Sequence, residues 1–164
     1  MKLGAALEHL HRSVDQLADE LRATAERHAV QQDVYHMGRT LSARIEELSS
    51  SLDPFLTAYG QSNAGGDGGE VLHSLAEKVR RGASVATGRS GKTGMLLLRD
   101  LRDLFVEASG VEMDWTIVRQ GAMAARDEPL VLAATVGLEE TRRVLRWLTT
   151  RVKEASPQIL MATD

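Results

Sequence analysis

Three short strings in this chain place a carboxylate and a histidine three residues apart. They are Glu8-x-x-His11, Asp33-x-x-His36 and Glu70-x-x-His73. On a helix, a separation of three residues puts both side chains on one face. Carboxylate oxygens and imidazole nitrogens together suit metals such as iron or manganese. These strings are therefore the first candidates for chemistry.

The positions of the first two strings argue against a shared metal site within one chain. Glu8 and His11 lie near the start of the first expected helix, and Asp33 and His36 lie near the start of the second. In an antiparallel hairpin these strings fall at opposite ends, about 30 Å apart at 1.5 Å per residue. Two copies of the chain could reunite them across an interface. An iron or manganese site of Glu8, His11, Asp33 and His36 between two subunits therefore remains an alternative hypothesis.

His28 falls on the apolar stripe of the first expected helix, close to its end. Its imidazole could cap the last carbonyls of the helix, where a partly positive ring is favoured. It could also bind a metal ion together with Asp33. We favour the capping interpretation.

Residues 86–93 are similar to a relaxed phosphate-binding loop in which Ala86 replaces the first glycine. Such a loop works because a strand leads into it and a helix N-terminus follows it. The sequence predicts the helix but no strand. Nucleotide binding through Gly91, Lys92 and Thr93 is therefore kept only as a third, weaker hypothesis.

The composition excludes several classes of protein. The 164 residues contain no cysteine, so disulfides, thiol catalysis and zinc–thiolate sites are ruled out. The net charge of −3 argues against a general nucleic-acid binder. No apolar run approaches the roughly 20 residues needed to span a membrane, and the first residues lack the core of a signal peptide. We therefore expect a cytoplasmic protein with neither a membrane nor a nucleic-acid partner.

Apolar residues recur every three or four positions through most of the chain, which predicts amphipathic helices. The expected helices span about 3–28, 31–58, 70–81, 93–126 and 129–154. Glycine-rich or small polar residues at about 60–69 and 82–92 predict flexible loops. Because the first two helices have almost no residues between them, and so do the last two, each pair must form an antiparallel hairpin. The sequence thus predicts a single all-α domain over 1–164.

Two residues of the 93–126 helix lead to specific structural predictions. Gly110 interrupts its apolar stripe and predicts either a bend or a close contact with another helix. Trp115 lies on the same stripe, where we expect it in the core or in an interface.

Two short hairpins joined by a long crossover resemble the ferritin-like four-helix bundle, and the C-terminal half is similar to a group of uncharacterised bacterial ferritin-like proteins. The residues that carry this similarity are Leu98-Arg99-Asp100-Leu101-Arg102-Asp103-Leu104, Asp114-Trp115, Gln120-Gly121-Ala122, Ala125-Arg126-Asp127, Glu140-Thr141, Trp147-Leu148 and Pro157-Gln158. The resemblance implies that the second and third long helices run parallel. It also implies a di-iron site with one Glu from each of two helices and a Glu-x-x-His from each of the others. Here the last helix offers Glu140-x-x-Arg143 instead, and an arginine would repel a cation.

These observations favour a ferritin-like four-helix bundle whose long crossover carries a short extra helix. We expect a non-catalytic protein without a cofactor, which acts through protein–protein association as a homodimer. The hairpin of residues 3–28 and 31–58 is the expected dimer surface, because Leu, Val and Met are abundant there. The protein partner and the biological process do not follow from the sequence.

Overall fold

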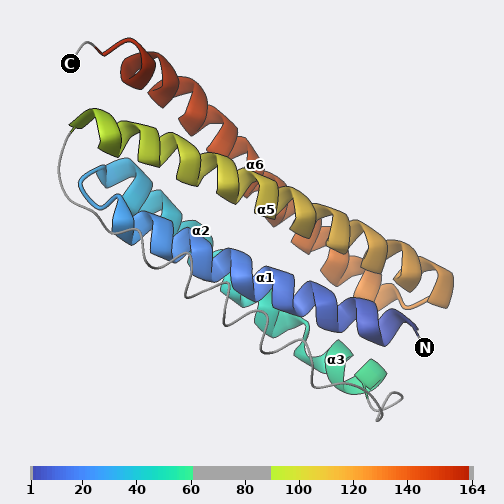
Figure 1. The fold of residues 1–164 in the computed structure, drawn as a ribbon. Coiled ribbons are helices and arrows are strands. Elements are labelled where there is room, and N and C mark those ends of the chain that lie inside the picture. Colours follow the sequence, from blue (N-terminus) through green and yellow to red (C-terminus); the bar gives the residue numbers. More distant parts are fainter. Residues whose placement is uncertain (1, 61–89, 163–164) are drawn as a thin grey trace.

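The computed structural model describes residues 2–60 and 90–162, and all regular structure within those residues is helical. The helices are α1 (Lys2–Arg27), α2 (Gln32–Ser51), α3 (Asp53–Gly60), α5 (Ser90–Ala125) and α6 (Glu128–Leu160). Four of them are long and lie side by side, and α3 sits at the end of the bundle where α1 begins (Figure 1). The expectation of an all-α fold is confirmed for these residues. Among the helices described, none has both the length and the apolar character needed to cross a bilayer.

Helix α1 packs against both α2 and α5. Its contacts with α5 join late residues of one helix to early residues of the other: His28 reaches Asp100, and Ser13 reaches Asp114. The two helices are therefore antiparallel, as Figure 1 also shows.

Helix α6 packs mainly against α5 and more sparsely against α2. Ion pairs between α2 and α6 join Asp33 to Arg151 and Arg44 to Glu140, so these helices are antiparallel too. Every pair of long neighbours thus runs in opposite directions. It follows that α2 and α5, on opposite corners, run in the same direction, as the resemblance implied.

The core is built from Leu, Val and Ala stripes with one large aromatic ring. Trp115 of α5 is fully buried, which confirms its expected place in the core. Its ring lies on Gly137 of α6, where an added Cβ would come within 2.4 Å of it. The absence of a side chain at Gly137 therefore makes room for Trp115 and lets α5 and α6 pack closely.

The helix expected over 31–58 is broken in two. Helix α2 ends at Ser51, and α3 begins at Asp53 after the buried Leu52. Pro54 explains the break, because it lacks an N–H group and its ring collides with the preceding turn of a continuous helix. In the first turn of a new helix the same residue is tolerated.

The last helix is longer than expected, because Ser156 and Pro157 do not end it. Helix α6 continues through Pro157 to Leu160. Pro157 lacks an N–H group and so removes one helix hydrogen bond. Ile159 packs on Gly94 of α5 and so holds the final turn against the bundle.

The turn between α5 and α6 is tight and well capped. The amide of Asp127 donates to the carbonyl of Ala122, and that of Arg126 donates to Met123, which is a Schellman arrangement. Arg126 takes φ 58° there, a conformation usually left to glycine. One Asp127 oxygen accepts from the Leu130 amide at the start of α6, and the other accepts from Tyr59 of α3.

The helix expected over 70–81 lies outside the described residues, as does most of both expected loops. At their edges two corrections can be made. Gly60 belongs to α3, and residues 90–92 already belong to α5. The second loop therefore ends earlier than its composition suggested.

Candidate functional site

Asp100 of α5 lies at the centre of a group of buried polar contacts. Its Oδ2 lies 2.8 Å from His28 Nε2 and 2.7 Å from Arg27 Nη1, both from the end of α1. Asp100 and His28 are almost completely buried. We call these three residues the Asp100 cluster. It corrects both hypotheses for His28, whose ring neither caps carbonyls nor faces Asp33 but pairs with a carboxylate of another helix.

The surroundings of Asp100 act on its pKa in opposite directions. Burial alone would raise the pKa of the carboxyl group, because it disfavours the charged form. The hydrogen bonds from His28 and Arg27, together with their charges, outweigh burial and lower the pKa below its ordinary value. Asp100 is therefore an ionised residue that joins α1 to α5, and it is not poised to transfer protons near neutral pH.

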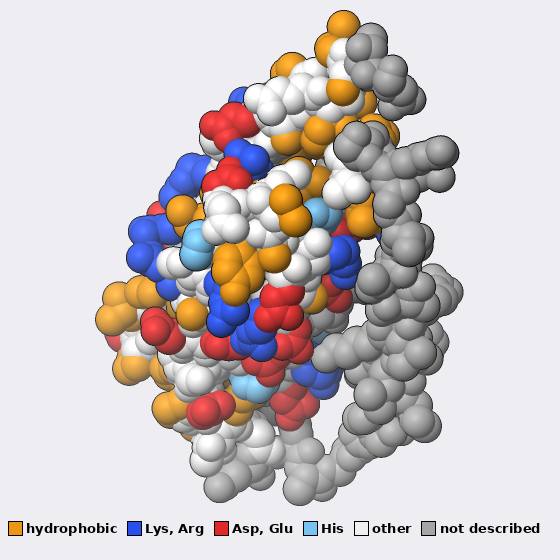
Figure 2. Space-filling model, turned by 90° about the vertical axis from the view of Figure 1, so that its left-hand side faces the viewer, with side chains coloured by type: hydrophobic (Ala, Val, Ile, Leu, Met, Phe, Trp, Pro, Cys, Tyr) orange, Lys and Arg blue, Asp and Glu red, His pale blue; other side chains and the backbone are white. Residues whose placement is uncertain are grey.

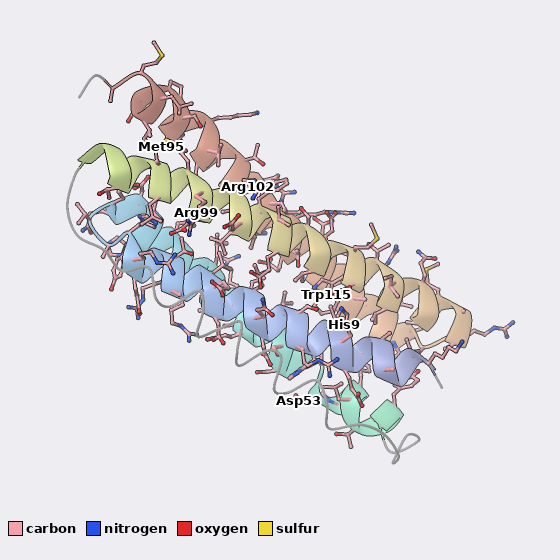
Figure 3. All side chains as sticks on the ribbon, viewed as in Figure 1. His9, Asp53, Met95, Arg99, Arg102 and Trp115 are labelled. Carbon is pink, nitrogen blue, oxygen red and sulfur yellow. The ribbon has the colours of Figure 1, made fainter. Side chains whose placement is uncertain are left out.

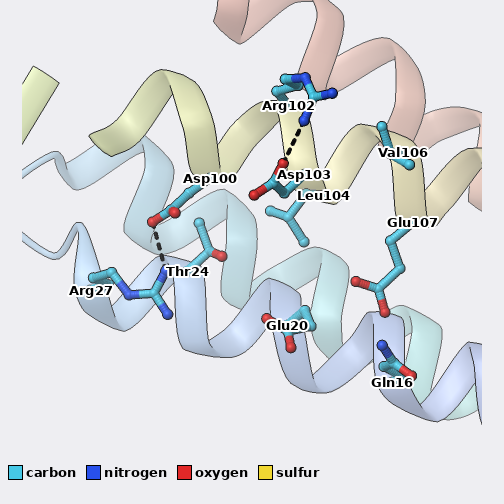
Figure 4. A pocket seen from close by; sticks show the side chains of 10 residues that line it. All are labelled: Gln16, Glu20, Thr24, Arg27, Asp100, Arg102, Asp103, Leu104, Val106 and Glu107. Atoms are coloured by element: carbon cyan, nitrogen blue, oxygen red, sulfur yellow. Dashed lines mark hydrogen bonds and ion pairs between the residues drawn. The ribbon is translucent and has the colours of Figure 1, made fainter. Parts of the chain in front are cut away.

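A shallow groove of about 320 Å³ runs between α1 and α5 beside this cluster (Figure 4). Both signs of charge line it: Arg27 and Asp100 form an ion pair on one side, and Arg102 and Asp103 form another. Glu20 and Glu107 also line it, so its four carboxylates outnumber its two arginines, but no group of side chains in the described residues could hold a metal ion. We assign it no ligand.

The first predicted metal string lies on the surface of α1. Glu8 is exposed, while the two ring nitrogens of His11 face different carboxylates. Nδ1 lies 3.4 Å from Asp15, and Nε2 lies 3.7 Å from Asp53 of α3, which is labelled in Figure 3. An imidazole held between two carboxylates links helices, and its nitrogens do not converge with Glu8 on one point.

The second predicted string lies at the other end of the bundle, as its place at the start of α2 required. Asp33 pairs with Arg151 of α6, and His36 Nε2 lies 3.1 Å from Gln32 Oε1. Within residues 2–60 and 90–162, no group of three or more His, Cys, Asp or Glu side chains could hold a metal ion. The proposed site between two copies of the chain is not tested by a single chain.

The centre of the bundle, where a ferritin-like di-iron site would lie, lacks suitable donors among the described residues. Ser42 and Thr141 are buried polar residues there, and each hydroxyl donates to a backbone carbonyl. Glu140, on the last helix, is bound by Arg44 and Arg143 at the surface instead. A di-iron centre needs several carboxylates and imidazoles. These residues therefore do not fit one.

A second polar cluster contains the residue types of a hydrolase triad, and no local sequence pattern predicts it. Ser13 donates to Asp114 Oδ2 at 2.8 Å, and His9 Nε2 lies 3.5 Å from the same oxygen. In a triad the imidazole must accept the serine proton. Here the acceptors of the serine hydroxyl are the Asp114 carboxylate and the His9 backbone carbonyl, not the imidazole, so the arrangement does not activate a nucleophile.

The phosphate-loop hypothesis falls mostly outside the described residues. Helix α5 begins at Ser90, and Thr93 is exposed, but the side chain of Lys92 is not described. The described residues contain no strand that could lead into such a loop.

A departure from an ordinary surface lies on the outer side of α5. Val106, Met113 and Ile117 are 58%, 60% and 54% exposed. Gly110, between them, has no atom within 4 Å of the place where its Cβ would be. Successive residues of this set are four, three and four positions apart, so all of them lie on one face of the helix. We call Val106, Gly110, Met113 and Ile117 the α5 ridge.

Two arginines extend the same face toward the beginning of α5. Arg99 and Arg102 are exposed and are labelled in Figure 3. By contrast, the side of the molecule seen in Figure 2 intermixes acidic, basic and scattered hydrophobic side chains. On the hairpin expected to form the dimer surface, the large exposed hydrophobics of the described residues are Val30 and Met37. The apolar surface thus gathers on α5 rather than on α1 and α2.

A scan against protein-family models, a search of curated proteins and a search of solved structures each found nothing that matches this chain.

Proposed function

We propose that this protein is a non-catalytic, ferritin-like helical bundle that acts through protein–protein association as a homodimer. The proposal includes a cytoplasmic location and no role in nucleic-acid binding. The observation that carries it is the α5 ridge, in which three large apolar side chains are more than half exposed on one helix face. A contiguous apolar face of this kind marks an interaction surface more often than a solvated one.

Two further features support the ferritin-like part of the proposal. Neighbouring long helices run antiparallel, while α2 and α5 run in the same direction and are joined by a long crossover. That connectivity is the one found in ferritin-like bundles. The apolar centre, with Trp115 and Gly137 packed together, favours a bundle of this topology that works without the di-iron centre.

The test combines solution mass with elemental analysis of protein from cells grown with added iron and manganese. We expect a dimer that contains less than about 0.1 metal ion per chain, since a specific site would approach one per site. About one metal ion per chain, lost in both His36→Ala and His11→Ala, would contradict the proposal. That result would instead support the site of Glu8, His11, Asp33 and His36 between subunits. Arg39→Ala, one helical turn from His36 and also exposed, is the matched control.

A further inference from the structure

The outer face of α5 has the spacing of a two-helix seam. Its positions are 99, 102, 106, 110, 113, 117, 120 and 124, separated by three or four residues throughout. Such a repeat keeps one stripe facing a partner helix over several turns. From 99 to 124 the stripe is about 38 Å long at 1.5 Å per residue. Helix α5 therefore carries two stripes, one buried in its own bundle and one exposed.

Gly110 occupies the middle of the exposed stripe, and no packing contact among the described residues requires a glycine there. A glycine in the interior of an exposed helix destabilises it by comparison with alanine. Helix α5 continues through Gly110 without a break. A close contact with another helix, one of the two roles predicted from the sequence, would use the missing side chain, and no atom of the described chain makes that contact.

Charge selects how a second copy would lie on this face. Arg99 and Arg102 stand at one end of the stripe, and Arg102 also pairs with Asp103. At the other end lie the C-terminus of α5 and the turn to α6, with Arg126, Asp127 and Glu128, which together carry one net negative charge. A parallel pair would set each arginine beside the same arginine of the second copy. An antiparallel pair sets the arginines beside the partly negative helix end and the acidic turn of the other copy.

We propose that the homodimer is formed by α5 against α5 of a second copy, antiparallel, around a two-fold axis between residues 111 and 112. In this register Met113 of each copy packs over Gly110 of the other, and Val106 packs beside Ile117. Arg99 lies beside Ala124 of the second copy, near its α5–α6 turn. The contact is self-complementary, as a two-fold interface must be. This inference rests on the homodimer of the proposed function and specifies its surface.

The absence of cysteine makes disulfide trapping a clean test, because a single introduced cysteine can pair only between copies. We would oxidise V106C alone, I117C alone and an equimolar mixture of the two at a concentration where the wild type is dimeric. The antiparallel register predicts a cross-linked dimer in the mixture and little in either variant alone. A43C, exposed on α2, is the control and should stay uncross-linked.

Cross-linking of V106C or I117C with itself would indicate a parallel pair and overturn the proposal. Absence of any cross-link in a protein that remains dimeric would overturn it as well, while leaving the homodimer itself intact. A wild-type chain that is monomeric would remove both this inference and the proposed homodimer.

A second variant tests the surface without oxidation. Met113→Glu brings a charge next to Gly110 of the other copy and should weaken the dimer by roughly tenfold or more. The matched control is Leu132→Glu, which places the same charge at an exposed apolar position of α6 and should leave the dimer unchanged. Circular dichroism confirms that both variants remain helical. Dissociation by Leu132→Glu but not by Met113→Glu would assign the interface to α6 and reject the α5 pairing.

Discussion

Asp100 shows how a single charge can be accommodated in an otherwise apolar interface between helices. Only 6% of its surface is exposed, and removing a carboxylate from water is unfavourable unless hydrogen bonds replace the lost ones. His28 and Arg27 supply those bonds from the neighbouring helix. The cluster therefore fixes how α1 and α5 sit against each other.

We expect Asp100→Asn to lower the free energy of unfolding at pH 7 by about 2–3 kcal/mol, because two charge-assisted hydrogen bonds become weaker. Urea unfolding monitored by circular dichroism measures this difference. Asp103→Asn, an exposed carboxylate on the same helix, is the control and should change stability by less than about 0.5 kcal/mol. Equal effects of the two substitutions would show that the cluster has no special role.

The pH dependence of the same difference follows from the lowered pKa of Asp100. The folded protein binds a proton at this group less tightly than the unfolded chain does. The stabilisation is therefore complete above the ordinary pKa of 3.8 and is lost as the pH falls below it toward the folded value. The gap between wild type and Asp100→Asn should thus stay constant at higher pH and shrink as the pH falls below about 4. A gap that widened over this range would mean that the pKa is raised instead.

Gly137 is the residue on which the buried tryptophan depends. A Cβ there would lie 2.4 Å from the Trp115 ring, which the packed core leaves little space to move. We expect Gly137→Ala to lower the free energy of unfolding by about 2–3 kcal/mol, despite the better helix propensity of alanine. Gly110→Ala, measured at a concentration low enough for the monomer, should instead raise it by about 0.5–1 kcal/mol. Stabilisation by Gly137→Ala would contradict the close packing.

The sequence predicts which residues are buried, but not which residues they contact on other helices. The sequence placed His28 on the buried stripe correctly, but its partner is 72 residues away on another helix. Periodicity gives the face of each helix and not the rotation and height at which two helices meet. For the same reason, Glu8 and Asp33 drew attention by their spacing, whereas the contact between Ser13 and Asp114 left no local pattern.

Among the helices, α5 has the least usual design, because apolar residues occupy two of its faces. The inner stripe, with Leu104, Val111 and Trp115, was evident from the sequence and is buried. The outer one was not recognised, since its residues interleave with the first and include Gly110. Exposure distinguishes the stripes only once the positions of α1 and α6 are known.

The turn from α5 to α6 permits a direct test of backbone strain. Arg126 holds φ 58°, where a side chain is unfavourable by about 1 kcal/mol relative to glycine. We therefore expect Arg126→Gly to raise the free energy of unfolding by about 0.5–1 kcal/mol. Arg126→Ala keeps the Cβ and should show little gain. A gain of the same size in both variants would assign the effect to the lost charge.

Helix α3 is attached to the turn between α5 and α6 through Tyr59. Its hydroxyl donates to Asp127 at 2.7 Å, and this bond to a carboxylate raises the pKa of the phenol. Asp127→Ala removes both this contact and the cap of α6, so it should destabilise the protein by about 1–2 kcal/mol. Tyr59→Phe loses only the contact and should have a smaller effect. Thermal unfolding of the two variants and of the double variant checks the order.

The boundaries of α2 and α3 show why element ends are harder to predict than elements. The apolar stripe from Val34 to Phe55 continues through the break, and only Pro54 signals it. Pro157 was expected to end the last helix but does not. The contact of Ile159 with Gly94 holds the last turn of α6 in place beyond it.

At the scale of the whole molecule, the two short connections and the long crossover were enough to predict an all-helical bundle with antiparallel neighbours. The α1–α2 hairpin and the α5–α6 hairpin bury their apolar stripes against each other in one core. Function was far less accessible, because the described residues do not bring together the carboxylates and imidazoles that a metal centre needs. The α5 ridge could not be predicted either, because the exposed fraction of each side chain depends on how the helices pack.

The most direct measurement is the solution mass of the full chain by light scattering, at concentrations from about 1 to 200 µM to cover a weak interface. We expect a mass that approaches twice the 17.9 kDa of one chain at the upper end and falls on dilution or in Met113→Glu. A wild-type mass that stays at 17.9 kDa throughout would contradict the homodimer and leave the α5 ridge without its proposed partner.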